Sequence, residues 1–241
     1  MRGTAALGCA VLVKLTHYRP SQNESAIAVP GAGQVSAILA RPARAHALLV
    51  LAHGAGAGMR HPFLESLARE LAAAGVATLR YQFPYMEQRR KAPDRPEFLT
   101  ETVRAAVAAA VERAAGLPVF AGGKSMGGRM TSLAASQQKL DGVRGLIFVG
   151  FPLHPPNKPG VERAEHLHSV GLPMLFLQGT RDPLAQLDLL DPVCAGLVPA
   201  PTLHIVDTAD HSFHVLKKSG ATDGQVLRGL ARTISSWTKT I

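Results

Sequence analysis

Apolar runs of strand length alternate with segments of helical periodicity along most of the chain. Six such runs predict buried strands at residues 46–52, 76–81, 119–121, 145–150, 173–177 and 202–206. Between two of them, Leu64, Leu67, Ala68 and Leu71 recur at spacings of three and four, which predicts an amphipathic helix that ends at Gly75. Strands that alternate with helices predict an α/β fold with a mostly parallel central sheet and helices on both faces.

The segments between and beyond these runs extend the same pattern. Two β-prone pieces, residues 26–29 and 35–39, flank a Pro-Gly-Ala-Gly turn and predict a hairpin. Periodic apolar positions predict three further helices, one containing Val103, one over residues 126–136 and one that ends near Trp237. The stretches 82–96 and 151–168 are rich in proline and predict surface loops.

Length and composition favour one large domain. The chain has 241 residues, of which 46% are hydrophobic and 18% charged, as is typical of globular proteins. We expect a single domain over residues 24–241, preceded by a poorly ordered N-terminal extension over residues 1–23. The start of the chain is typical of a ragged or over-extended terminus rather than an export signal, because Lys14 interrupts the first apolar stretch and no small-residue cleavage site follows.

The cysteine content and the net charge indicate a cellular compartment and a kind of ligand. Cys9 and Cys194 are far apart and form no Cys-x-x-Cys motif, which favours a reducing compartment and a cytoplasmic location. No apolar run reaches the roughly 18 residues that a membrane span needs. The net charge of +9 attracts anions. Because the basic residues are spread along the chain without a nucleic-acid module, we expect an anionic substrate or simple solubility rather than nucleic-acid binding.

The strongest chemical motif is Gly123-Lys124-Ser125-Met126-Gly127, which follows a predicted strand and precedes a predicted helix. This Gly-x-Ser-x-Gly pattern is typical of a nucleophile elbow, where a strained turn carries the serine hydroxyl at its tip. Glycines flank the serine because a Cβ at either position would collide with the neighbouring strand or helix. The pattern is short, so a turn that only permits close packing is the alternative.

Two further residues stand where the strands of such a sheet end. Serine needs an imidazole to accept its proton, and the imidazole needs a carboxylate to orient it. Asp182 and His211 follow the strands at 173–177 and 202–206, in the order nucleophile, acid, base that this chemistry has on α/β sheets. The alternatives are Asp207 or Asp210 as the acid, and His214, His204 or His53 as the base, and Asp182 also suits a helix N-cap.

The glycine-rich stretch 53–58 follows the strand at 46–52 and supplies a possible oxyanion site. Its small residues allow the backbone N–H of Ala55 to face that of Met126, so that both stabilise an oxyanion. A phosphate cradle is the alternative, but neither spacing of the phosphate-binding glycine motifs is present. His166-Leu167-His168 lacks a nearby carboxylate or cysteine, so we expect no metal and no cofactor.

Several stretches together resemble one branch of the α/β-hydrolases, related to dienelactone hydrolases and shared by testis-expressed and non-specific-lethal-complex proteins. They are residues 51–63, 83–87, 89–96, 122–130, 150–156 and 178–183. The resemblance covers about residue 47 to the C-terminus and implies the triad Ser125, Asp182 and His211. True dienelactone hydrolases have cysteine as the nucleophile, so Ser125 fits ester or thioester hydrolysis better.

The resemblance also implies an α/β-hydrolase fold without a large cap domain, since the loops 82–96 and 151–168 stand in its place. We expect them to leave an open site rimmed by Arg89, Arg90, Lys91, Lys158 and His154, which favours a small or anionic acyl substrate. The expected function is therefore that of a serine esterase or thioesterase. A non-catalytic binding or scaffold protein, an acyl transferase and a peptidase are the alternatives.

Overall fold

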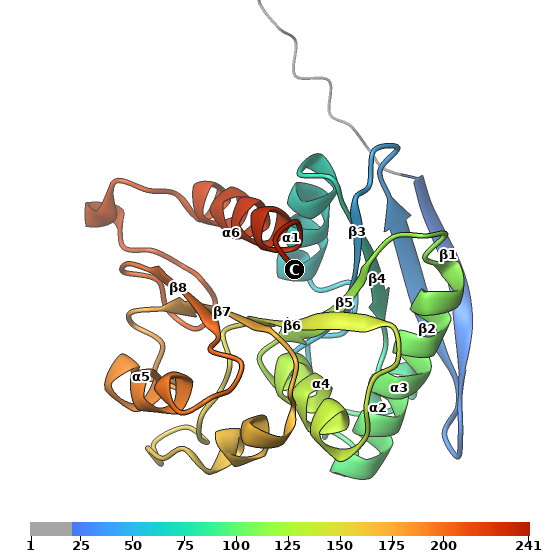
Figure 1. Cartoon of the computed structure of the whole chain (residues 1–241), viewed down its shortest axis with the longest axis horizontal. Coiled ribbons are helices and arrows are strands. Elements are labelled where there is room, and N and C mark those ends of the chain that lie inside the picture. Colours follow the sequence, from blue (N-terminus) through green and yellow to red (C-terminus); the bar gives the residue numbers. More distant parts are fainter. Residues whose placement is uncertain (1–20) are drawn as a thin grey trace, which may run out of the picture.

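The computed structural model describes residues 21–241, which form one mixed sheet between two layers of helices (Figure 1). The sheet has eight strands in the order β1-β2-β4-β3-β5-β6-β7-β8, parallel from β4 onward. Their bounds are β1 Ser21–Val29, β2 Gly33–Arg41, β3 Ala47–Ala52, β4 Val76–Tyr81, β5 Val119–Lys124, β6 Val143–Val149, β7 Met174–Gly179 and β8 Thr202–Val206.

The antiparallel part of the sheet is the predicted hairpin. β1 pairs with β2 in continuous register, and β2 pairs antiparallel with β4. The predicted N-terminal extension, residues 1–23, lies outside the described residues except for its last part, which begins β1 at Ser21. The expectation about the first residues of the chain also concerns residues that the structure does not describe.

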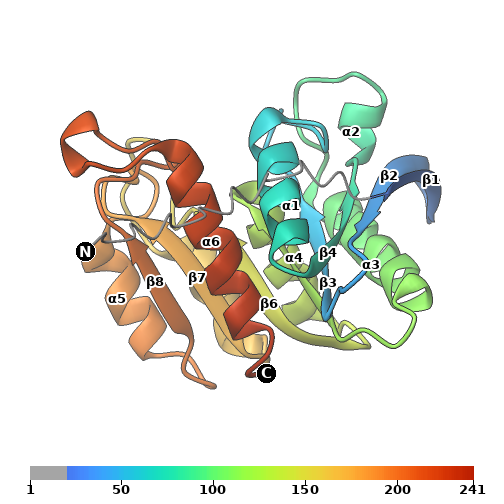
Figure 2. The same cartoon turned by 90° about the horizontal axis from the view of Figure 1, so that it is seen from above.

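Helices cover both faces of the sheet. α1 (Pro62–Ala73) and α6 (Asp223–Trp237) lie side by side on one face, and α3 (Pro96–Arg113), α4 (Met126–Gln137) and α5 (Leu187–Ala195) lie on the other (Figures 1 and 2). Each face encloses its own cluster of buried apolar side chains. The central strands β3 and β5 are buried on both faces, which explains their continuous apolar sequences.

The two proline-rich stretches carry short helices that the sequence did not predict. The first contains the single turn α2 (Pro84–Glu87), and the second contains the 3-10 helix η1 (Glu162–Ser169). Another 3-10 turn, η2 (Lys217–Ser219), precedes α6. No cap domain covers the ends of the parallel strands within residues 21–241, as expected.

Candidate active site

Ser125 occupies the tight turn between β5 and α4. Its backbone has φ 52° and ψ −119°, a region that non-glycine residues rarely adopt. A Cβ at Gly123 would lie 2.5 Å from the carbonyl oxygen of Ala52, and one at Gly127 would lie 2.6 Å from that of His53. Glycine is therefore required on both sides of the serine by the close approach of the end of β3, as the sequence predicted.

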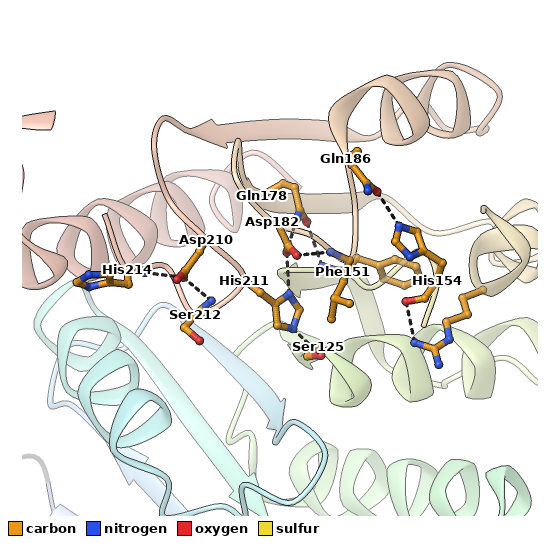
Figure 3. A network of polar contacts seen from close by, with 12 residues as sticks. Ser125, Phe151, His154, Gln178, Asp182, Gln186, Asp210, His211, Ser212 and His214 are labelled. Atoms are coloured by element: carbon orange, nitrogen blue, oxygen red, sulfur yellow. Dashed lines mark hydrogen bonds and ion pairs between the residues drawn. The ribbon is translucent and has the colours of Figure 1, made fainter. Parts of the chain in front are cut away.

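The structure brings the three predicted residues Ser125, His211 and Asp182 together in one hydrogen-bonded row (Figure 3). The hydroxyl oxygen of Ser125 lies 2.9 Å from His211 Nε2, and His211 Nδ1 lies 2.7 Å from Asp182 Oδ2. Asp182 follows β7 and His211 follows β8, so neighbouring parallel strands deliver both groups to the same edge of the sheet.

The carboxylate of Asp182 is buried, and each of its oxygens accepts at least one hydrogen bond. Its Oδ1 accepts the N–H of Leu184 at 2.8 Å, and its Oδ2 accepts the side-chain amide of Gln178 at 2.6 Å in addition to His211. Burial raises the pKa of Asp182, but the hydrogen bond and charge of His211, with the bonds from Leu184 and Gln178, outweigh burial and lower it. Asp182 therefore stays ionised and fixes the orientation of the imidazole.

Gln178 was not singled out from the sequence. Its amide nitrogen binds Asp182, and its amide oxygen accepts the N–H of Phe151, the residue just beyond the turn that follows β6. A glutamine at the end of an otherwise apolar strand, four residues before an aspartate, is the signal that could have identified it.

The alternative acids are engaged elsewhere. Asp207 Oδ1 accepts a hydrogen bond from the hydroxyl of Thr180 at 3.3 Å. Asp210 Oδ1 accepts the N–H groups of Ser212 and His214 at 2.8 and 3.0 Å, which shapes the turn that carries His211 (Figure 3). Neither carboxylate is hydrogen-bonded to His211.

The alternative bases also lie away from Ser125. His214 is exposed and pairs with Asp223 at 2.8 Å, which raises its pKa. His204 lies in the edge strand β8. His53 is buried, and its Nε2 accepts the N–H of Phe83, so its Nδ1 carries the proton and donates to the carbonyl of Gly54 at 2.7 Å. Burial lowers the pKa of His53 to about 4, so it is neutral and serves to hold this loop.

The glycine-rich loop lies against the elbow. A Cβ at Gly54 would lie 3.7 Å from the Cβ of Ser125, and Gly56 donates its N–H to the hydroxyl of Tyr85 at 2.9 Å. Within residues 21–241, neither the N–H of Ala55 nor that of Met126 donates a hydrogen bond to another protein group. Both predicted oxyanion donors therefore have no competing partner among these residues.

A cavity of about 300 Å³ opens in front of Ser125. It is lined by Gly54, Ala55, Ala57, His61, Phe63, Leu64, Lys124, Ser125, His211 and Ser212. The side chains that line it include two serines, two histidines and one lysine, but no carboxylate. The cavity can therefore accept a negatively charged group without repulsion from its own wall.

The predicted basic rim does not form this cavity. None of Arg89, Arg90, Lys91 and Lys158 lines it. His154, predicted at the rim, is buried instead, because its Nε2 is hydrogen-bonded to Gln186 at 2.6 Å and its Nδ1 to the carbonyl of Pro155 at 2.8 Å. The rim prediction is therefore wrong for His154, and the other four residues lie outside the lining of this cavity, because the sequence did not reveal how the two proline-rich loops fold.

Lys124 lines the cavity instead, although the sequence pattern gave it no role. Its ammonium nitrogen is covered by protein and has no hydrogen-bond partner among the described residues. Burial lowers the pKa of Lys124 to about 8, while the charges of Asp182 and Asp210 act in the opposite direction. A lysine between Gly and Ser, at the end of a buried strand, is the signal that could have identified it.

The remaining findings concern metal ligands, His166 and membrane-spanning helices. The described part of the chain contains no group of three His, Cys, Asp or Glu side chains arranged to hold a metal ion. His166, one of the two histidines considered for metal binding, has its Nε2 hydrogen-bonded to the buried Ser132 hydroxyl at 2.7 Å. None of the helices between residues 21 and 241 is both long and apolar enough to cross a membrane.

Comparisons with known proteins agree with this architecture. A family model described as an alpha/beta hydrolase domain matches residues 45–239. A dienelactone hydrolase from Anabaena variabilis superposes with a TM-score of 0.73 at 22% identity, over 92% of this chain and 99% of that one. An alpha-beta serine hydrolase homologue from Coxiella burnetii gives 0.71 at 21% identity, over 90% and 98%. A Xanthomonas campestris serine hydrolase without lid gives 0.66 at 18% identity, over 90% and 97%. At these identities, the three structures show a shared fold.

Proposed function

Because this chain belongs to the alpha/beta hydrolase family, we propose that it is a serine hydrolase that cleaves a carboxylic ester or thioester. The observation that carries the proposal is the row of hydrogen bonds from Ser125 through His211 to the buried carboxylate of Asp182. Such a row activates a serine that is otherwise a poor nucleophile. The related structures named as esterases and serine hydrolases have the same fold and are consistent with this chemistry.

In the proposed mechanism, the Ser125 oxygen attacks the acyl carbon while His211 Nε2 accepts the hydroxyl proton. The imidazolium is stabilised by Asp182, and the N–H groups of Ala55 and Met126 stabilise the oxyanion. His211 then gives its proton to the departing alcohol or thiol, which leaves an acyl group on Ser125. A water molecule attacks this acyl-enzyme, His211 accepts and returns its proton, and the products are a carboxylic acid and free Ser125.

A fluorophosphonate probe tests the proposal, because it reacts only with an activated serine. We expect the folded wild type to be labelled, and Ser125→Ala and His211→Ala to lose labelling. The matched controls are Ser212→Ala, which removes another serine of the same cavity, and His214→Ala, which removes another histidine of the same loop. Both controls should keep labelling.

The Asp182→Asn variant adds a kinetic measurement to the labelling experiment. Asp182→Asn should lower kcat for a carboxylic ester by about 10⁴, because the amide favours the wrong tautomer of the imidazole. A folded wild type that is not labelled, or a Ser125→Ala protein that is labelled as fast as the wild type, would contradict the proposal. The first of these results would favour a binding or scaffold role.

A further inference from the structure

Resting on the proposed function, we propose that Lys124 selects substrates that carry a carboxylate, so that the enzyme favours half-esters of short dicarboxylic acids over neutral esters. The starting observation is that Lys124 both precedes the nucleophile and lines the cavity in front of it. It is the one lysine or arginine among the residues that line this cavity, and no aspartate or glutamate accompanies it.

The ammonium of Lys124 has no hydrogen-bond partner within residues 21–241. Two aromatic rings flank it, with the centroids of Phe63 and Phe213 at 5.9 and 5.8 Å from Nζ, and these rings stack on each other. Their faces attract the cation but accept none of its three hydrogen bonds. A buried ammonium without acceptors is costly, so an anion supplied from the cavity would be bound strongly.

The carboxylates nearest to Lys124 are already engaged. Three side chains surround Gly150. A Cβ added to this glycine would lie 3.1 Å from Lys124 Nζ, 3.5 Å from His211 Nδ1 and 3.6 Å from Asp182 Oδ2. The ammonium therefore lies near the hydrogen bond between His211 and Asp182. It forms no ion pair with Asp182 among the described residues, and both oxygens of that carboxylate accept other hydrogen bonds. No acceptor among the described residues therefore competes with a ligand for this ammonium, although the ammonium is covered by protein and has to turn toward the cavity to meet one.

The size of the cavity and the reach of lysine define the ligand. A cavity of about 300 Å³ is at the small end of ligand sites and suits a short chain. The flexible four-carbon stem of lysine lets its ammonium turn toward a carboxylate in the cavity. The other titratable groups of the wall are His61 and His211, so nothing in the wall repels an anion. The net charge of +9 also attracts anions from a distance.

The test compares two methyl esters of similar shape. One is monomethyl glutarate, and in the other an isopropyl group replaces its free carboxylate, so that the compound is neutral. We expect the wild type to favour the charged ester in kcat/KM by about tenfold or more, as a charge-assisted hydrogen bond provides. In Lys124→Met this ratio should fall to about one, and Lys124→Arg should keep part of it. Lys158→Met, which removes an exposed lysine that does not line the cavity, should keep all of it.

The pH dependence provides a readout on the wild type alone. Because kcat/KM reports the free enzyme, the preference for the charged ester should decrease as the pH rises through the pKa of Lys124, about 8. The charges that face this ammonium are those of Asp182 and Asp210, with His211 and His61 in the cavity wall. A ratio that is independent of pH between about 7 and 9 would contradict the proposal, even if Lys124→Met failed to fold.

Binding separates this proposal from the proposed hydrolysis. Calorimetry with Ser125→Ala, which cannot turn over, should show that monomethyl glutarate binds about tenfold more tightly than its neutral counterpart. Adding Lys124→Met should remove this difference. A wild type that is labelled by the fluorophosphonate but has no preference for the charged ester would overturn the role of Lys124 and leave the hydrolase proposal intact. A preference that survives in Lys124→Met but disappears when Arg89, Arg90 and Lys91 are reversed in charge would also overturn it.

Discussion

Replacing Lys124 with methionine should make the protein more stable, because the lysine is buried as a cation without a hydrogen-bond acceptor in the described part of the chain. Its pKa falls from 10.5 to about 8 because burial disfavours the charged form. A pKa shift of this size means that folding costs the charged lysine about 3 kcal/mol at neutral pH, relative to the unfolded chain. Methionine has a similar length, carries no charge and packs well against aromatic rings such as Phe63 and Phe213. We therefore expect Lys124→Met to gain about 3 kcal/mol in unfolding free energy at pH 7.

The pH dependence of this gain has a definite sign. The unfolded chain keeps the Lys124 proton up to a pH of about 10.5, whereas the folded protein releases it at about 8. Between these values the unfolded state binds more protons, so the stability of the wild type rises with pH. Methionine makes no such contribution. The advantage of Lys124→Met should therefore shrink by about 2 kcal/mol between about pH 7 and about pH 9.5.

Equilibrium unfolding in urea, followed by the fluorescence of the single tryptophan Trp237, measures this difference. Taking the difference between the two proteins at each pH cancels the contribution of other groups, among them Tyr81, whose pKa is raised by burial. Lys158→Met is the control for loss of an exposed lysine and should change the stability little at any pH. A Lys124→Met protein less stable than the wild type at pH 7, or a difference that does not vary with pH, would refute the reasoning.

Two further predictions concern the residues around the serine. Gly127→Ala should cost several kcal/mol of unfolding free energy or prevent folding, because the added Cβ would lie 2.6 Å from the His53 carbonyl oxygen. The control in the same urea assay is Gly229→Ala, where the added Cβ meets open space. His53 should destabilise the folded protein in acid, since its pKa of about 4 lies below the 6.5 of the unfolded chain, so the unfolded state binds more protons between these values. Relative to His53→Gln, the wild type should lose up to about 3 kcal/mol between pH 7 and 4, and equal losses would contradict this.

Much of the fold could be predicted from the period of the apolar residues. The strands β4 and β8 have the bounds that the sequence predicts, because each is a complete apolar or β-prone run between turn residues. The helix α5 was missed, since its nine residues include Pro192 and acidic residues that disguise the periodicity. The start of β1 was missed because Ser21–Val29 is an edge strand whose first residues are polar and gain their hydrogen bonds only from β2.

The candidate site could be predicted as far as chain topology determines it. Ser125, Asp182 and His211 each follow a strand of one parallel sheet, and the ends of such strands meet at one edge whatever the details of packing. The roles of Lys124 and Gln178 depend on which side chains surround them, and that information is spread over several elements. Lysine is usually exposed, so only the arrival of Phe63 from α1 and Phe213 from the loop after β8 reveals that its ammonium is covered.

Two features that oppose stability lie next to one another in sequence and line one cavity. Ser125 has a strained backbone, and Lys124 buries a charge that has no acceptor among residues 21–241, while the strands beside them are almost completely buried and apolar. A strained or unpaired group persists where the surrounding structure holds it in place, and such groups cluster at functional sites. The strain at Ser125 has an evident use, since it exposes the hydroxyl beside His211. The charge of Lys124 has no hydrogen-bond partner among residues 21–241, and a negatively charged substrate is the simplest reason for its position.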